Sequence, residues 1–137
     1  MKKQRVTRRT RTKSKKIKHK STRILKNKLW KLISEYVRRR DKGVCFTCGD
    51  TRPWKEQQAG HYIHGCLDYD EININCQCVR CNKWLHGNSG IYAERLIKKF
   101  GPEEVSLLRK RSKQIIKYSV LTLENLIQLY KETLEDM

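Results

Sequence analysis

The sequence predicts an α+β fold, in which a small metal-stapled core lies between an N-terminal helix and C-terminal helices and follows a disordered basic arm. Three observations predict this fold. Apolar residues recur at helical spacing near both ends of the chain, Cys, His, Gly and Asn fill the middle, and the first 20 residues show no apolar periodicity. We expect an arm at 1–21, a stapled domain with its leading helix at 22–101, and a helical extension at 102–137.

Positive charge is concentrated in the arm. The 137-residue chain has a formal net charge of +18, and residues 1–28 hold 14 Lys and Arg and no acidic residue, so the other 109 residues carry only +4. Such a segment favours a polyphosphate partner, because each neutralised phosphate releases condensed counterions. The alternative is that this basic segment is a solubilising tail or contacts an anionic membrane. No apolar run resembles a secretory signal or a membrane span, so we expect a reducing cytoplasm.

The first helix is predicted to begin at Ser21, a suitable N-cap, and to stop at Gly43. Its apolar face is formed by Leu25, Leu29, Leu32, Ile33, Tyr36 and Val37. Three arginines, Arg38 to Arg40, end the helix, where cations suit the negative end of the helix dipole and can also contact phosphate.

The middle of the chain breaks into short segments. We expect one strand at 57–63, a partner strand at 72–74 and a helix that begins near Val79. Helical periodicity returns at Ile91 and stops at Gly101, and Pro102 is well placed to open a further helix with Val105, Leu108 and Ile115. Thr122 is the expected cap of a last helix whose inner face holds Leu123, Leu126, Ile127, Tyr130 and Leu134. We expect these C-terminal helices to serve as a scaffold or to form the contact surface of a homodimer.

Two CxxC pairs predict a structural zinc site. Cys45 and Cys48 form the first pair, Cys78 and Cys81 form the second, and 29 residues separate them. Four thiolates complete a closed tetrahedral site, and Gly49 suits a tight turn after the first pair. Such a site contributes roughly 10–16 kcal/mol of apparent binding free energy to folding. The other two cysteines, Cys66 and Cys76, are expected to be small buried or half-buried thiols, although Cys76 lies close enough to Cys78 to compete as a ligand.

Histidines and asparagines cluster between and after the CxxC pairs. If a helix starts near Val79, Asn82 and His86 fall at positions i and i+4 and share one face, which suits two ligands of one metal ion. His61 would project from the preceding strand toward the same point. Phosphodiester hydrolysis needs a base for water and a cation for the leaving oxygen, and His titrates near neutral pH. The alternative is that these polar residues only hold irregular loops together.

Several motifs together resemble the phage lambda NinG (Rap) recombination-protein family. The resemblance covers roughly residues 25–101. It rests on the helix from Leu29 to Tyr36, the stretch from Tyr92 to Gly101, and four motifs between them, which are Cys45-x-x-Cys48-Gly49, Trp54-Lys55-Glu56-x-Gln58-Ala59-Gly60-His61, Asp70-Glu71-x-Asn73 and Gln77-Cys78-x-Arg80-Cys81-Asn82-Lys83-x-x-His86-Gly87-Asn88.

The resemblance implies a role in homologous recombination, with binding to branched DNA such as Holliday junctions and D-loops. We therefore expect the partner to be DNA, preferentially branched or single-stranded. It also implies a ββα-metal (HNH-like) core and an HNH-type endonuclease. On that pattern His61 corresponds to the general base, and Asn73 to the residue that orients the loop carrying the base. Asn82 or His86 corresponds to the ligand of a catalytic Mg²⁺ or Mn²⁺. The implied location is the cytoplasm of the bacterial host.

This sequence departs from the HNH pattern beside the base. Gly60 stands where many HNH sites place an Asp or His that binds the metal, so the ion would rest on fewer protein ligands, with help from His64, Asp68 or Asp70. The stretch after the base, from His64 to Cys66, is also less basic than is usual in the family. These departures leave open a site that has lost catalysis.

DNA contacts are expected from the basic residues of the arm, the first helix and the second CxxC pair, namely Arg8, Arg9, Arg11, Lys15, Lys16, Lys18, Arg38, Arg39, Arg40, Arg80 and Lys83. We expect Trp54 and Trp84 to pack around the cysteine knuckles, with stacking on unpaired bases as the alternative.

Phage or host recombination proteins are further expected partners. The main rival function is a non-catalytic zinc module that recognises junctions and recruits other recombination factors. A second rival is an RNA-binding zinc protein. It is less favoured, because such a protein has no need for His61, Asn73 and His86 in this order. A transcriptional regulator is disfavoured, since no helix-turn-helix pattern is evident.

Overall fold

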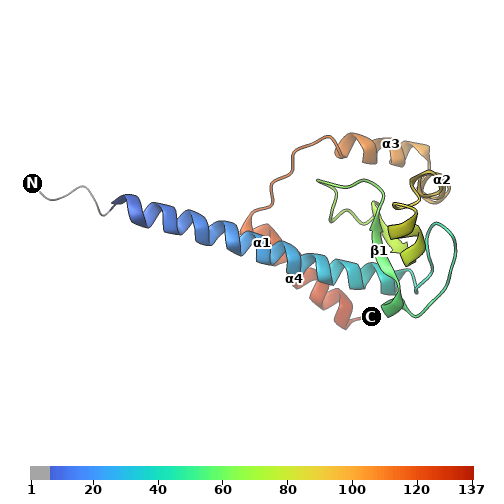
Figure 1. Ribbon diagram of the computed structural model, residues 1–137, viewed down its shortest axis with the longest axis horizontal. Coiled ribbons are helices and arrows are strands. Elements are labelled where there is room, and N and C mark those ends of the chain that lie inside the picture. The colour runs from blue at the N-terminus through green and yellow to red at the C-terminus, as the bar shows by residue number, and fades with distance from the viewer. Residues whose placement is uncertain (1–6) are drawn as a thin grey trace, which may run out of the picture. The chain divides into compact units, whose positions relative to one another are not determined.

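The structure, a computed structural model, describes the backbone of residues 7–137 and the side chains from Ser21 onward (Figure 1). The fold is α+β. Its elements in chain order are α1 (Thr7–Arg40), η1 (Trp54–Glu56), β1 (Gln58–His61), β2 (Ile74–Gln77), η2 (Arg80–Trp84), α2 (Ser89–Phe100), α3 (Pro102–Arg111) and α4 (Val120–Glu135). The chain forms two compact units. One consists of Trp30–Lys117. The other consists of the part of α1 that ends at Leu29 and of Tyr118–Met137.

Helix α1 begins at Thr7, well before the expected start at Ser21. The segment from Thr7 to Lys20 holds no Pro or Gly and many Lys and Arg, which are good helix formers, so a helix nucleated further along the chain can extend into it. Within the described part, Leu29, Ile33 and Val37 are buried, as the periodicity predicted. The rest of the expected arm, residues 1–6, lies outside the described residues.

The two strands form an antiparallel pair in which Gln58 lies opposite Gln77 and His61 lies opposite Ile74. The first strand falls inside the predicted range, whereas the second begins at Ile74 instead of ending there. The carboxylate of Asp70 explains this shift, because it accepts bonds from the backbone N–H groups of Ile72 (3.0 Å) and Asn73 (3.3 Å) and so holds them in a turn. Two strands alone are marginal in water, so this sheet needs support from its surroundings.

The end of α1 is fastened to β2. The Arg40 guanidinium donates to the backbone oxygen of Ile74 at 3.1 Å and to the side chain of Asn75 at 3.2 Å. The Asp41 carboxylate accepts from the backbone N–H of Cys76 at 2.8 Å and pairs with Arg40 at 2.7 Å. These contacts satisfy part of the outer edge of β2. The first cysteine knuckle, Cys45 to Gly49, is held beside the same strand by the Phe46 N–H, which donates to the Cys76 carbonyl at 2.8 Å.

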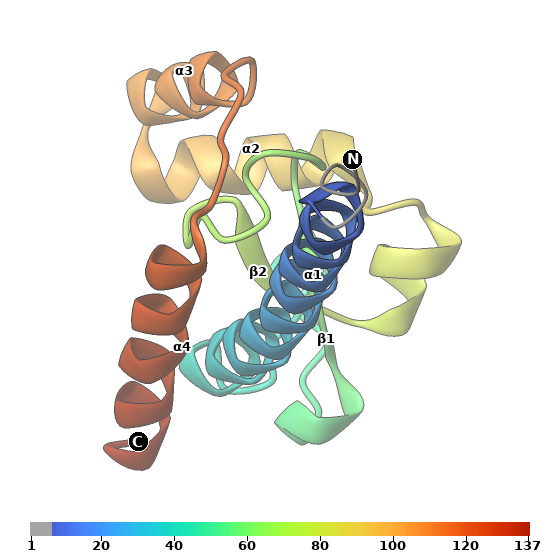
Figure 2. The same ribbon diagram turned by 90° about the vertical axis from the view of Figure 1, so that its left-hand side faces the viewer.

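Helices α2 and α3 pack side by side (Figure 2). Together with Leu67 they form an apolar cluster of the Trp30–Lys117 unit. The cluster consists of Leu67, Tyr92, Leu96, Val105 and Leu108, all buried. Gly101 and Pro102 separate the helices as predicted. Ile115 was expected on the apolar face of α3, but this helix ends at Arg111 and the Ile115 side chain is 90% exposed.

Helix α4 belongs to the other unit and buries Leu123, Ile127 and Tyr130. Its N-cap is Ser119 and not the predicted Thr122, because the Ser119 hydroxyl accepts a bond from the Thr122 backbone N–H at 3.1 Å. Among the described residues, no helix combines the length and apolarity needed to cross a lipid bilayer.

Candidate metal centre and histidine site

The two CxxC pairs meet at one point. The sulfur atoms of Cys45, Cys48, Cys78 and Cys81 all lie within 4.8 Å of one another, and the Cys48 and Cys78 sulfurs are 3.7 Å apart. Four sulfurs placed about 2.3 Å from a tetrahedral ion are separated by about 3.8 Å. The cluster could therefore hold a metal ion such as zinc, and the thiol donor set is one that Zn²⁺ prefers.

Backbone and side-chain donors surround these sulfurs. The first knuckle turns at Gly49, where φ is +79°, and the Gly49 N–H donates to the Cys45 carbonyl at 2.8 Å. In the second knuckle the Cys81 N–H donates to the Cys78 sulfur at 3.4 Å, and the Asn88 amide donates to the Cys81 sulfur at 3.8 Å. Donors of this kind orient the ligands of a metal and stabilise their thiolate form.

The metal-free thiols differ in acidity. Burial raises the pKa of Cys48 to about 12 and also raises the pKa of Cys78. Burial acts in the same direction on Cys45, but hydrogen bonds from the Thr47 side chain and from nearby backbone outweigh it and lower the pKa of Cys45 to about 6. Metal binding must therefore displace protons from the cluster, and its affinity falls as the pH falls.

The remaining cysteines stand apart from the cluster, as predicted. The half-buried Cys66 thiol donates to the carbonyl oxygen of Ser112 at 3.2 Å and to that of Arg111 at 3.5 Å. Cys76 is completely buried in β2, and burial raises its pKa to about 12. Neither thiol belongs to the group of four that could hold a metal.

His61 ends β1 with its ring held on two sides. Its imidazole stacks on the indole of Trp30, with ring centroids 4.7 Å apart. Its Nε2 lies 3.3 Å from the backbone oxygen of Asp68, which can only accept, so Nε2 carries the proton and Nδ1 is the basic nitrogen of the neutral ring. Burial lowers the pKa of His61 below its usual 6.5, against the opposing effect of Asp68, whose carboxylate lies 3.7 Å from Nε2.

Asn73 fixes the loop that follows His61. Its side-chain oxygen accepts from the Ile63 N–H at 2.8 Å, and its amide nitrogen donates to the carbonyl oxygens of Ile63 at 2.7 Å and Leu67 at 3.1 Å. The side chain is completely buried. Asn73 thus holds the irregular chain on the far side of His61 in one conformation.

Asn82 and His86 do not share a helical face. The segment after Val79 forms only the short π-helix η2, which ends at Trp84, and His86 lies beyond it with φ of +50° and an exposed side chain. The Asn82 amide donates to the Gln58 side chain at 2.8 Å, which places Asn82 beside β1. The expected i, i+4 arrangement is therefore wrong, because the Gly87 N–H bonds the Cys81 carbonyl at 2.9 Å and closes the turn early.

The side chain of Gln77 fills the space in front of Gly60. A Cβ atom on Gly60 would overlap the Gln77 Oε1 and lie 3.0 Å from the Asn82 Oδ1. The Gln77 amide nitrogen is fixed by bonds to the Thr47 hydroxyl at 3.2 Å and the Gly87 carbonyl at 2.9 Å, so this amide cannot easily turn away. Glycine before His61 thus follows from the packing of Gln77, which leaves no room for a side chain at this position.

Replacing Gly60 with Ala should lower the free energy of unfolding by about 2–3 kcal/mol, because the added methyl group overpacks a buried site and breaks the bonds of Gln77. Urea denaturation followed by tryptophan fluorescence measures this. Gly90→Ala is the matched control, since a Cβ there meets nothing within 4 Å and alanine favours the helix. Equal urea midpoints for Gly60→Ala and wild type would show that Gln77 is not held as described.

The three residues considered as extra ligands differ in availability. The Asp70 carboxylate is occupied by the turn before β2 and by Arg111 at 3.2 Å. The Asp68 carboxylate lies beside His61, and the exposed His64 has its ring centroid 5.5 Å from that of His61. Among the described residues, the four cysteines are the one group of three or more Cys, His, Asp or Glu that could hold a metal.

The predicted DNA-contacting residues fall into three groups. The side chains of Arg8, Arg9, Arg11, Lys15, Lys16 and Lys18 lie outside the described residues. Arg40 is used within the fold, as described above, and Arg38 and Arg39 lie over the Trp54 ring at 5.2 and 6.0 Å from its centroid. Arg80 and Lys83 are exposed on η2.

The tryptophans were expected to pack around the knuckles, and this is wrong for Trp84, which is 76% exposed at the end of η2. Trp54 is half-buried among cationic side chains. Trp30, Gln58 and Gln77 contribute to the site. They stand within the segments that carry the resemblance, but no role was predicted for them, because no local pattern pairs them with residues so distant in the chain.

Comparisons with known proteins agree with one another. The family model described as "Bacteriophage Lambda NinG protein" matches residues 1–137. The chain is 37% identical over 78 residues to Protein ninG of Escherichia phage 933W, and 36% identical over 78 residues to that of Escherichia phage lambda. Each match covers 53% of this chain and 38% of the relative. Protein ninG of Salmonella phage P22 is 36% identical over 74 residues, which cover 50% of this chain and 36% of that relative. No solved structure matches the chain.

Proposed function

Because the chain belongs to the bacteriophage lambda NinG family, we propose that it is a phage recombination protein that binds branched DNA, such as Holliday junctions and D-loops, and cleaves it as a metal-dependent HNH-type endonuclease in the cytoplasm of the bacterial host. In this proposal the four cysteines hold a structural zinc ion, and the protein works with phage or host recombination proteins. The homodimer expected from the sequence stays part of the proposal.

The environment of His61 supports the catalytic part of the proposal best. The ring is stacked on Trp30 and anchored through Nε2, which directs the basic Nδ1 away from the Asp68 carbonyl. A neutral, oriented imidazole is what a general base needs in order to take a proton from water as it attacks phosphorus. Asn73 would act as a positioning residue, since it holds the adjacent loop through Ile63.

A divalent ion would be held by Asn82 or His86, which do not share a helical face, and would supply positive charge for the departing 3′ oxygen. The oxygen of Asn82 lies 3.0 Å from the point that a Cβ atom on Gly60, the residue before His61, would occupy. This supports Asn82 as a hard donor near the proposed base. Mg²⁺ usually retains several waters and takes few protein ligands when phosphate is present, so a sparse donor set is compatible with such an ion.

The second candidate function is a non-catalytic zinc module that binds junctions and recruits other recombination factors. The observation that favours it is the absence, among the described residues, of a second group of three or more Cys, His, Asp or Glu beyond the four cysteines. Gly60 in place of an acidic ligand points the same way.

The deciding experiment assays cleavage of a synthetic four-way junction with Mg²⁺ or Mn²⁺ and measures metal content on the same samples by mass spectrometry. One tightly held zinc plus an exchangeable ion that activates cleavage is the expected result. Tight junction binding with no product under any metal condition would instead support the recruiting module.

Neutralising the basic part of α1 should weaken DNA binding and make it less sensitive to salt. Each phosphate contact contributes about 0.9 to the slope of log affinity against log salt for duplex DNA. We expect the change of Arg8, Arg9, Arg11, Lys15, Lys16 and Lys18 to Gln to reduce the slope by about 3–5. Fluorescence anisotropy with a labelled junction at several salt concentrations measures the slope.

The control for this variant changes Lys110, Lys113 and Lys117 to Gln, which removes exposed charge elsewhere. Its slope should stay within about 1 of wild type if the arm contacts phosphate directly. Similar slopes for the arm variant and wild type would contradict the role of the arm.

A further inference from the structure

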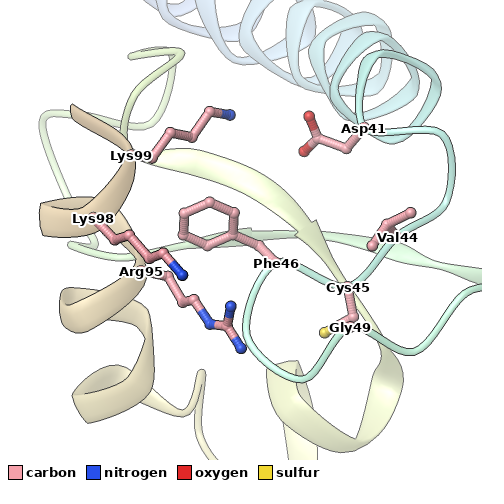
Figure 3. Close-up of a pocket in the computed structure, with 8 residues that line it drawn as sticks. All are labelled: Asp41, Val44, Cys45, Phe46, Gly49, Arg95, Lys98 and Lys99. Atoms are coloured by element: carbon pink, nitrogen blue, oxygen red, sulfur yellow. The ribbon is translucent and has the colours of Figure 1, made fainter.

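A cleft of about 540 Å³ lies between the first cysteine knuckle and α2 (Figure 3). Arg95, Lys98 and Lys99 of α2 form a cationic wall, and Phe46 and Val44 offer apolar surface. The volume lies within the range of small-ligand sites and is large enough for more than an inorganic anion.

The Phe46 ring is held in place and also open to the cleft. It packs against Tyr92 with ring centroids 5.2 Å apart, and its backbone N–H donates to the Cys76 carbonyl at 2.8 Å. The Lys99 ammonium lies 5.6 Å from the ring centroid. Figure 3 shows Lys99 on one side of the ring and the ends of Arg95 and Lys98 on the other, so cations flank the aromatic group.

The one acidic residue of the lining does not cancel this charge. The Asp41 carboxylate is paired with Arg40 at 2.7 Å and accepts from the Cys76 N–H at 2.8 Å. Val44, by contrast, is 40% exposed and adds apolar surface near the rim. The cleft therefore offers positive charge and an aromatic face, with its only carboxylate already compensated.

We propose that this cleft binds an unpaired nucleotide of single-stranded DNA, with the base stacked on Phe46 and the flanking phosphates on Arg95 and Lys98. An aromatic ring beside cations is the arrangement by which proteins bind single strands without reading sequence, because every base has a π-face and every nucleotide a phosphate. The proposal rests on the proposed DNA binding and adds to it the place where a single strand is bound.

Two other roles for the cations predict different results. Lys98 and Lys99 stand in the last turn of α2, where positive charge stabilises a helix. Cys45 also lines the cleft, so Arg95 and Lys98 could compensate the negative charge of a zinc–thiolate cluster. The first role affects helix stability and the second affects zinc retention, and neither requires DNA.

The test compares Lys98→Glu with Lys110→Glu, which changes net charge equally in the last turn of α3. The ligand is a fluorescent twelve-nucleotide oligothymidylate, and binding is measured by anisotropy. We expect Lys98→Glu to weaken binding about ten-fold and Lys110→Glu to have less than a two-fold effect. Both variants should retain one zinc and the wild-type circular dichroism spectrum.

A second measurement locates the base. Oligothymidylate carrying one 5-iododeoxyuridine should crosslink on irradiation to the peptide that contains Phe46, because this photoreaction favours stacked aromatic rings. Phe46→Leu keeps an apolar side chain at the position and should abolish the crosslink while zinc content is unchanged. Binding of the variant should be about five- to ten-fold weaker than that of wild type.

The outcomes separate this proposal from the broader one. Junction binding with equal oligothymidylate affinities for the two glutamate variants would overturn the cleft proposal alone. A crosslink at Trp54 or Trp84 in place of Phe46 would also overturn it, as would loss of zinc from Lys98→Glu. Failure of wild type to bind either junction or oligothymidylate would overturn both proposals together.

Discussion

Removal of zinc should unfold the segment between Gly43 and Asn88. This segment contains one two-stranded sheet and two short helical turns, and its buried side chains include several polar ones, such as Asn73, Asn75 and Gln77. A structural zinc site contributes roughly 10–16 kcal/mol of apparent binding free energy. The net stability of a whole domain is only about 5–15 kcal/mol, so an ion bound by the four cysteines would decide whether the segment folds.

Cys78→Ser tests this most directly, because it removes one of the two thiols that form the 3.7 Å contact between the pairs. We expect the purified variant to hold no zinc and to lose the near-ultraviolet circular dichroism of its packed aromatic rings. Addition of a strong chelator to wild type should give the same spectrum, and addition of Zn²⁺ should restore it.

Cys66→Ser is the matched control. Its thiol only donates to two backbone carbonyls, which a serine hydroxyl can also do, and it lies outside the cluster. This variant should retain one zinc per chain and a wild-type spectrum. A chelated wild-type protein with unchanged spectrum and unfolding midpoint would show that the cysteines support the fold without a metal.

The parts of the fold that could be predicted from the sequence are those set by local chemistry. The spacing of the CxxC pairs predicted a cluster that the structure brings within 4.8 Å. The pair Gly101-Pro102 predicted the boundary between α2 and α3, because one residue ends a helix and the other opens one. Three of the six residues predicted to form the apolar face of α1, Leu29, Ile33 and Val37, are completely buried, and the other three are half-buried.

The parts that could not be predicted depend on contacts between distant segments. Nothing local to Trp30 shows that its indole lies against His61. The reason for Gly60 is a glutamine on the neighbouring strand, which becomes visible only when the register of β1 and β2 is known. The end of η2 was missed for a related reason, since the knuckle closes the turn before Asn82 and His86 can share a face.

Replacing His61 with Ala should reduce junction cleavage by about 10²- to 10⁴-fold, which is the usual contribution of a general base. The variant should bind the junction as tightly as wild type, because the expected phosphate contacts lie on the arm and on exposed cations such as Arg80 and Lys83. Single-turnover cleavage and anisotropy on the same preparation measure the two effects separately.

The pH dependence offers an independent check on the role of His61. Burial lowers its pKa below 6.5, so the neutral ring that accepts a proton persists to more acidic pH than an exposed histidine would allow. The single-turnover rate of wild type should therefore fall on acidification with a midpoint below pH 6.5, which is lower than for an exposed histidine. Trp30→Leu exposes the ring to water, which should move this fall toward higher pH while leaving DNA affinity unchanged.

His64→Ala is the control for His61→Ala, since it removes an exposed imidazole from the same loop, with its ring centroid 5.5 Å from that of His61. Cleavage by this variant should stay within about three-fold of wild type, because the ring has no anchor comparable to the Asp68 carbonyl. Equal rates for His61→Ala and wild type under every metal condition would remove His61 from catalysis. The protein would then act by junction binding alone, because the arrangement around His61 is the structural feature that supports catalysis of DNA cleavage.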